Sequence, residues 1–274
     1  MAERRRPRAA SRAGRRFARV LLAGAMLGVL AGCESQLVLK ADDADRGLVI
    51  VLPGIDGRMP YNEIAARHLA EQDIRMAVEL RDWTAPLGML YNQTAVMRNR
   101  EVAQTVAARI EAYRREHPGR PVFLIGHSGG TALAVWAAEA LPADEPVDGI
   151  ILLASSLSPT YDLSAALARS RGGIVSFYST LDGGLLGIGT TLVGTMDGRH
   201  GESAGKVGFH RPGESGGSDP YPRLYQVAWD PKMIAAGHGG GHFDYMSLGF
   251  VSTYIAPLIR ASAWDRQVAQ LSRL

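Results

Sequence analysis

The chain has 274 residues, of which 46% are hydrophobic, with 32 Gly, 14 Pro and one Cys. Its formal charge of +3 arises at the N-terminus, because residues 1–32 hold eight Arg and one acid. The remainder has 22 basic and 26 acidic residues, a net charge of about −4. This charge gives no indication of a nucleic-acid surface, and a single Cys excludes an intramolecular disulfide.

The N-terminal segment has the features of an export signal. A basic region at 1–19 precedes an apolar run of twelve residues at 20–31, which is shorter than a membrane-spanning helix requires. Residues 30–33, LAGC, resemble the lipobox of bacterial lipoproteins, in which the signal is cut before the Cys and the thiol is lipidated. The resemblance implies a signal peptide at 1–32 and a lipid anchor on Cys33, in a bacterial cell envelope.

Two features of this segment leave alternatives. The pair Arg15-Arg16 is typical of twin-arginine export, but Arg19 stands where that signal prefers an apolar residue, which favours an ordinary basic region. An ordinary signal peptide followed by a chance Cys is the alternative to a lipoprotein. Glu34 follows the Cys in place of Asp, and by resemblance to proteobacterial sorting this favours the outer membrane over the inner one.

Strand and helix patterns alternate along the rest of the chain, after a lipidated Cys and polar tether at 33–46. Apolar runs rich in β-branched residues predict strands. They lie at 37–40 (within the tether), 47–52, 74–80, 121–125, 147–154, 173–179 and 224–229. Apolar residues at helical spacing predict helices at 61–72, 92–116, 131–141 and 250–274, the last broken near Pro257. This order predicts one α/β domain at 47–274, a mostly parallel sheet with helices on both faces and its ligand site at the carboxyl ends of the strands.

Two connections of the predicted sheet differ in character. Residues 183–223 are rich in Gly, Ser, Pro and charge and are too long for a plain connection, so we expect a loop excursion or a partial lid. Residues 155–172, between the fourth and fifth major strands, are too few for a large cap domain. The sequence therefore favours an open site.

The pattern G-x-S-x-G occurs three times, centred on Ser128, Ser203 and Ser215. It marks a nucleophile only where a buried strand leads directly into the serine and a helix follows at once, on a strained turn. Ser128 has the strand 121–125 before it and the helix 131–141 after it. Ser203 and Ser215 have no preceding strand and no prompt helix start, so flexible loops are expected there.

At Gly126-His127-Ser128-Gly129-Gly130 the chain resembles the α/β-hydrolase superfamily, and the resemblance extends over about residues 47–256. It implies a serine hydrolase of the esterase or lipase kind, with Ser128 as nucleophile, and a chain order of Ser, acid, His. No metal and no organic cofactor is implied. A loop after the first major strand and the residue after the nucleophile supply the oxyanion hole in this family, which implies the amides of Ile55 and Gly129, although the "HGGG" form of that loop is missing.

The acid and the base each have two candidates. Asp182 follows the fifth major strand and is the expected acid, with Asp230 as the alternative one strand later. His242 precedes the closing helix and is the expected base, with His238 as the alternative. The resulting hypothesis is a membrane-anchored serine hydrolase that cleaves a carboxylic ester of a small molecule or lipid through an acyl-enzyme. Amide and thioester substrates stay open, as does the oligomeric state, and a non-catalytic lipoprotein that keeps the fold for ligand or partner binding is the alternative function.

Overall fold

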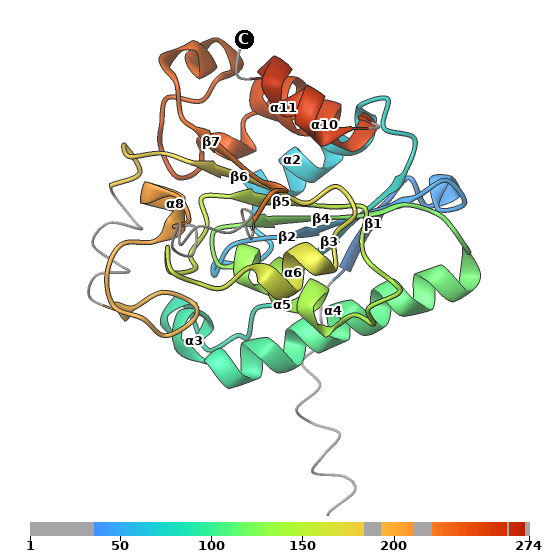
Figure 1. The fold of residues 1–274 in the computed structure, drawn as a ribbon, viewed down its shortest axis with the longest axis horizontal. Helices are drawn as coiled ribbons and strands as arrows, with labels where there is room; N and C mark the ends of the chain where they lie inside the picture. Colours follow the sequence, from blue (N-terminus) through green and yellow to red (C-terminus); the bar gives the residue numbers. More distant parts are fainter. Residues whose placement is uncertain (1–35, 184–192, 211–220, 262, 272–274) are drawn as a thin grey trace, which may run out of the picture. The chain divides into compact units, whose positions relative to one another are not determined.

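A seven-stranded sheet forms the centre of the computed structural model, which describes residues 36–183, 193–210, 221–261 and 263–271 (Figure 1). The strands are β1 (Gln36–Leu39), β2 (Leu48–Leu52), β3 (Ala77–Arg81), β4 (Val122–His127), β5 (Gly149–Leu153), β6 (Ile174–Tyr178) and β7 (Leu224–Ala228). Their order is β1-β3-β2-β4-β5-β6-β7. Strands β2 to β7 are parallel and β1 is antiparallel to β3, so the prediction of a mostly parallel sheet is confirmed.

Helices cover both faces of the sheet, as Figure 1 shows. Along β2 and β5, alternate residues enter two separate hydrophobic clusters, because successive side chains of a strand point to opposite faces. One face packs against α4 (Val96–Glu116), α5 (Gly130–Ala140) and α6 (Ser164–Ala168). The other packs against α2 (Pro60–Glu71), α10 (Ala256–Arg260) and α11 (Trp264–Leu271). Short 3-10 turns lie at Ala41–Asp43, Pro231–Ala236 and Asp244–Met246.

The N-terminal boundary of the domain lies earlier than the sequence predicts. Residues 36–39 form the edge strand β1, whose Gln36 pairs with Arg81 at the end of β3. Leu37 and Leu39 pack against the core, while Val38 points away from it. The strand predicted at 37–40 within the tether therefore forms, and it is an edge strand of the sheet. The signal peptide and Cys33 fall outside the described residues, and within those residues no helix has the length and apolarity to cross a bilayer.

Two predicted helices are divided. The helix expected at 92–116 is α3 (Met89–Thr94) followed by α4, with a break at Ala95, whose ψ is 59°. The Asn99 side chain crosses the break, and its Nδ2 donates to the backbone oxygen of Asn92 (2.7 Å). The closing helix consists of α9 (Leu248–Phe250), a π-helical turn (Val251–Ile255), α10 and α11, and Pro257 lies in the first turn of α10, where its missing N–H costs nothing.

The connection at 183–223 contains ordered structure around Ser203. Helix α8 (Ala204–Val207) begins directly after this buried serine, so the flexible loop predicted there is wrong. The reason is a close backbone contact with the sheet: Gly205 donates to the Ser155 oxygen (2.7 Å), and a Cβ on Gly205 would lie 2.4 Å from the carbonyl carbon of Ala154. Residues 184–192 and 211–220, which include Ser215 and much of the predicted lid, are outside the described residues.

Candidate active site

Ser128 stands on a sharp turn between β4 and α5. Its φ is +52°, a left-handed conformation that non-Gly residues rarely adopt and that signals stored strain. The flanking glycines make this turn possible. A Cβ on Gly126 would lie 2.6 Å from the Gly130 oxygen, and one on Gly130 would lie 2.1 Å from the Leu52 oxygen. The G-x-S-x-G spacing at this site is thus required by close contact within the elbow at Gly126 and with the end of β2 at Gly130.

The Ser128 hydroxyl faces a second serine that sequence reasoning did not single out. Its Oγ lies 3.4 Å from the Oγ of Ser156, which is long for a hydrogen bond between hydroxyls. The backbone oxygen of Ser128 accepts from Thr131 Oγ1 at 2.5 Å, which fixes the turn. Ser156 follows β5 at the carboxyl edge of the sheet, and that position is the signal that could have identified it.

Asp182 and His242 form a buried pair at the same edge of the sheet. His242 Nδ1 lies 2.8 Å from Asp182 Oδ2, and the two residues are 9% and 1% exposed. Asp182 follows β6, where its amide donates to the Ser179 oxygen (3.1 Å). An Nδ1–H donated to the carboxylate leaves Nε2 as a proton acceptor. Among the described residues, His242 makes no direct hydrogen bond to Ser128, whose hydroxyl contacts that of Ser156.

His127, the variable residue of the elbow, holds the segment that carries His242. Its Nε2 lies 3.0 Å from the backbone oxygen of His242, and the two rings are 4.9 Å apart between centroids. Burial, and then the nearby His242, lower the pKa of His127 to about 3. The ring is therefore neutral, and Nε2 must carry its proton because a carbonyl oxygen can only accept. Sequence reasoning gave this residue no such role, because its partner lies 115 residues away.

The two amides expected in an oxyanion hole lie close together. A Cβ on Gly129 would come 3.4 Å from the Ile55 nitrogen and 2.6 Å from Ile55 Cγ2. The loop at 53–57 is fixed by Trp83 Nε1, which donates to the Pro53 oxygen (2.7 Å), and by Asn92 Nδ2, which donates to the Ile55 oxygen (3.0 Å). Within the described part of the chain, neither the Ile55 nor the Gly129 amide donates to a protein acceptor. Both N–H groups are thus available to a ligand.

The alternative acid and base lie in other surroundings. Asp230 is exposed and caps a 3-10 turn by accepting from the Lys232 amide (2.9 Å). His238 is fully buried, and its Nδ1 accepts from the Gly240 amide at 3.0 Å. Burial lowers the pKa of His238 to about 4, so this imidazole stays neutral. Nothing in the described structure joins His238 or Asp230 to Ser128.

Exposed apolar side chains neighbour the site residues along the chain. Met59, Leu181 and Phe243 are each about half exposed, and they stand in the loop after Ile55, beside Asp182 and beside His242. The Asp56 carboxylate accepts from the Tyr61 hydroxyl, and burial raises its pKa. In the described residues, no group of three or more His, Cys, Asp and Glu side chains is placed to hold a metal ion.

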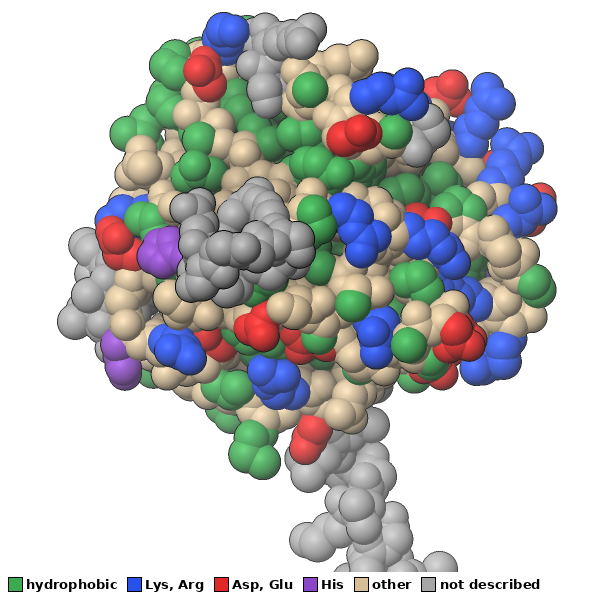
Figure 2. Space-filling view, in the orientation of Figure 1, with side chains coloured by type: hydrophobic (Ala, Val, Ile, Leu, Met, Phe, Trp, Pro, Cys, Tyr) green, Lys and Arg blue, Asp and Glu red, His purple; other side chains and the backbone are tan. Residues whose placement is uncertain are grey.

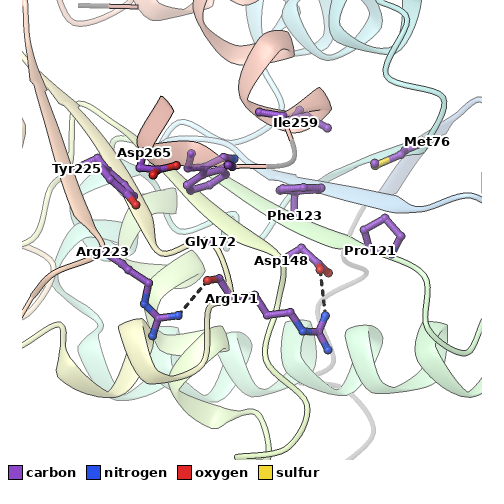
Figure 3. A pocket seen from close by; sticks show the side chains of 13 residues that line it. Met76, Pro121, Phe123, Asp148, Arg171, Gly172, Arg223, Tyr225, Ile259 and Asp265 are labelled. Atoms are coloured by element: carbon purple, nitrogen blue, oxygen red, sulfur yellow. Dashed lines mark hydrogen bonds and ion pairs between the residues drawn. The ribbon is translucent and has the colours of Figure 1, made fainter. Parts of the chain in front are cut away.

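A cavity of about 570 Å³ lies at the opposite edge of the sheet (Figure 3). Phe123, Gly172 and Arg223 line it, at or just before the starts of β4, β6 and β7. Its polar groups bind one another: Arg171 pairs with Asp148 (3.0 Å), and Arg223 donates to the Arg171 oxygen (2.9 Å). This cavity is therefore separate from the Ser128 site.

Comparison with known proteins gives a family match and a fold match. Residues 43–181 match the hydrolase family described as serine aminopeptidase, S33. Aspergillus fumigatus lipase B is 13% identical, with a TM-score of 0.50 over 83% of this chain and 56% of the lipase, so the chain spans little more than half of that lipase. Two further structures resemble the chain less closely. Esterase PE8 is 18% identical, with a TM-score of 0.45 over 76% of this chain and 91% of the esterase. Est1E from Butyrivibrio proteoclasticus is 10% identical, with a TM-score of 0.47 over 86% of this chain and 93% of Est1E. No curated protein sequence matches.

Proposed function

The chain belongs to the serine aminopeptidase (S33) family of α/β-hydrolases, and we propose that it is a serine hydrolase that cleaves a carboxylic ester. The observation that supports this most directly is the strained Ser128 turn at the carboxyl edge of the sheet, where the Asp182–His242 pair also lies. A protein that kept the fold only for binding would have no need of a positive φ at this serine. The non-catalytic alternative is therefore less favoured.

In the proposed reaction Ser128 Oγ attacks the ester carbonyl while His242 Nε2 takes the hydroxyl proton. Asp182 holds Nδ1–H and stabilises the imidazolium that forms. The Ile55 and Gly129 amides donate to the oxyanion, and each such donor supplies on the order of 3 kcal/mol in known hydrolases. His242 then returns the proton to the leaving alcohol, and a water attacks the acyl-enzyme by the reverse sequence.

Apolar surroundings favour an ester with an apolar acyl group over an aminoacyl substrate. Met59, Leu181 and Phe243 offer contact surface for a hydrocarbon chain. An aminopeptidase must bind a free α-ammonium group, which calls for an available carboxylate. Two carboxylates that lie near His242 already have partners: Asp182 binds the His242 imidazole, and Asp56 accepts from Tyr61 and has a raised pKa.

The proposal includes attachment to a bacterial cell envelope through lipidated Cys33. Its support is the sequence alone: the basic region, the apolar run and the LAGC motif at 30–33. Loss of membrane fractionation in Cys33→Ser, together with globomycin-sensitive processing of the unsubstituted chain, is the expected outcome.

Active-site labelling tests the catalytic part of the proposal. The full chain in membranes should react with a fluorophosphonate probe and hydrolyse p-nitrophenyl butyrate, and Ser128→Ala should abolish labelling and lower kcat by at least about 10³-fold. Ser203→Ala is the matched control, because it removes another buried G-x-S-x-G hydroxyl and should leave labelling intact. Faster turnover of an aminoacyl p-nitroanilide than of the ester would favour peptidase activity. Labelling that survives in Ser128→Ala would refute the assignment.

A further inference from the structure

Helix α3 presents its apolar side chains to solvent and its polar ones to the protein. Asn92 and Gln93 are 3% and 7% exposed, whereas Met89 and Leu90 are 56% and 64% exposed. This is the reverse of the usual arrangement for a helix at the surface of a water-soluble domain. Leu87, Tyr91 and Met97 extend the exposed apolar surface. We call Leu87, Met89, Leu90, Tyr91 and Met97 the apolar rim.

The apolar rim is held rigidly next to the candidate site. Asn92 Nδ2 donates to the Ile55 oxygen (3.0 Å) and Asn92 Oδ1 accepts from the Ala85 amide (2.9 Å). Gln93 Nε2 donates to the Gly194 oxygen (2.9 Å). These buried polar contacts fix α3 so that its apolar face points outward. The same Asn92 therefore positions both the rim and the proposed oxyanion loop.

Other exposed large apolar side chains lie at the same edge of the sheet. They stand in the segments that follow β2, β6 and β7, with one in α2 and one at the start of α9, and they are Met59, Ile64, Leu181, Ile234, Phe243 and Leu248. Val38, in the body of β1, is the exception among the described residues. In Figure 1 the carboxyl ends of the strands and α3 lie at the left, and in Figure 2 the Lys and Arg side chains gather mainly at the right of the same view. Such an apolar surface marks a site of interaction with a protein or a membrane.

The position of β1 decides between these two partners. Gln36 pairs with Arg81 at the carboxyl end of β3, and the next residues of the chain lead to Leu87 and α3. Cys33 precedes Gln36 by three residues, which can span about 10 Å at most. A lipid attached to Cys33 would therefore hold the membrane surface near the edge of the sheet that carries the apolar rim.

We propose that the apolar rim docks on the lipid bilayer, so that the edge of the sheet with Ser128 faces the membrane and receives ester substrates from it. This inference rests on the proposed lipid anchor and deepens the proposed function, because it makes membrane lipids the substrate class. Side chains of this kind, buried in the headgroup region, add apolar area to the attraction of the anchor. A short anchor alone would leave the orientation of the domain free.

Contact with the bilayer can be measured without catalysis. The full chain carrying Ser128→Ala and Leu90→Trp is reconstituted in phosphatidylcholine–phosphatidylglycerol vesicles whose acyl chains are brominated. We expect the added tryptophan to be quenched at least about twofold more than Ala143→Trp, the control in the exposed loop that precedes β5 at the opposite edge of the sheet. Equal quenching at the two positions would overturn the proposal. It would also be overturned if the tryptophan of Leu90→Trp were shielded from solvent in detergent without vesicles, because a dimer or a bound protein would then cover the apolar rim.

Activity then tests the consequence for substrate. The variant Leu87→Ser/Met89→Ser/Leu90→Ser should hydrolyse a long-chain ester in vesicles at least about tenfold more slowly, with turnover of water-soluble p-nitrophenyl acetate unchanged. Val38→Ser should change neither. Equal losses on both substrates would mean that the rim supports the fold and would contradict membrane delivery. If Ser128→Ala kept its activity, the proposed function would fail, and the quenching result would still decide the docking surface.

Discussion

His127 Nε2 donates to the backbone oxygen of His242 across 3.0 Å, so the residue that precedes the proposed nucleophile holds the segment that carries the proposed base. Both residues are almost completely buried. Two consecutive residues of the elbow therefore serve different purposes. Ser128 presents the hydroxyl, and His127 fixes the distance from the elbow to the loop after β7.

Removal of this hydrogen bond should lower kcat more than it lowers the stability of the fold. We expect His127→Ala to lower kcat by about 10-fold to 100-fold, because a displacement of the base by a fraction of an ångström weakens proton transfer. His127→Gln should retain kcat within about threefold, since its Nε2 can donate to the same oxygen. The measurement is ester turnover at pH 8, with thermal unfolding as the control for folding. Equal kcat for the two variants would show that the contact positions nothing.

The same histidine should make the protein less stable in mild acid. Its pKa falls from 6.5 in an unfolded chain to about 3 in the folded one, so the unfolded state binds the proton more tightly. The contribution of the neutral His127 to the free energy of unfolding is fully present above pH 6.5 and is lost as the pH falls toward 3. Between pH 8 and pH 5 the loss amounts to about 2 kcal/mol. Urea unfolding of His127→Gln should show a correspondingly smaller decrease over this range, and a parallel pH dependence in both proteins would contradict a neutral buried His127.

The positions of the strands and the elbow could be predicted from local pattern, but the contacts of the site could not. Runs such as 122–125 and 150–153 are long, apolar and β-branched, and their burial on both faces follows directly. The pattern at 37–40 predicts the strand, yet its pairing with β3 depends on partners about 40 residues away. Likewise, the break at Ala95 depends on side chains of Asn92 and Asn99 that bond to backbone instead of pointing outward.

Side chains brought together by the fold were the hardest to predict. Ser156 was overlooked because nothing in its local sequence distinguishes it from Ser155 or Ser158. The helix after Ser203 was missed because four residues carry too little periodicity, and the α8 segment is stabilised by backbone contact with the end of β5. Sequence order alone did favour Asp182 over Asp230, since the first follows β6 and the second follows the edge strand β7.

The elbow should not tolerate a methyl group at Gly130. A Cβ there would lie 2.1 Å from the Leu52 oxygen and 2.4 Å from the Pro53 oxygen, both of them backbone atoms that cannot rotate away. We expect Gly130→Ala to lower the free energy of unfolding by about 3 kcal/mol and to abolish fluorophosphonate labelling. Gly183→Ala is the control, because among the described residues its Cβ would have a single neighbour, the Leu181 oxygen at 3.9 Å. A stable, labelled Gly130→Ala protein would mean that the elbow and the end of β2 lie far enough apart to admit a methyl group.

Exchange of one carboxylate oxygen for an amide should distinguish the proposed acid from its alternative. An Asn at position 182 can donate to His242 Nδ1, which would place the imidazole proton on Nε2 and remove the acceptor that Ser128 needs. We therefore expect Asp182→Asn to lower kcat by about 10³-fold to 10⁴-fold and to slow fluorophosphonate labelling, with little change in the melting temperature. Asp230→Asn keeps an acceptor for the Lys232 amide and should leave kcat within about twofold. A large loss in Asp230→Asn with normal turnover in Asp182→Asn would reverse the assignment. Paired measurements on His242→Gln and His238→Gln extend the test to the base, because the buried His238 bonds to Gly240 and should affect stability more than kcat.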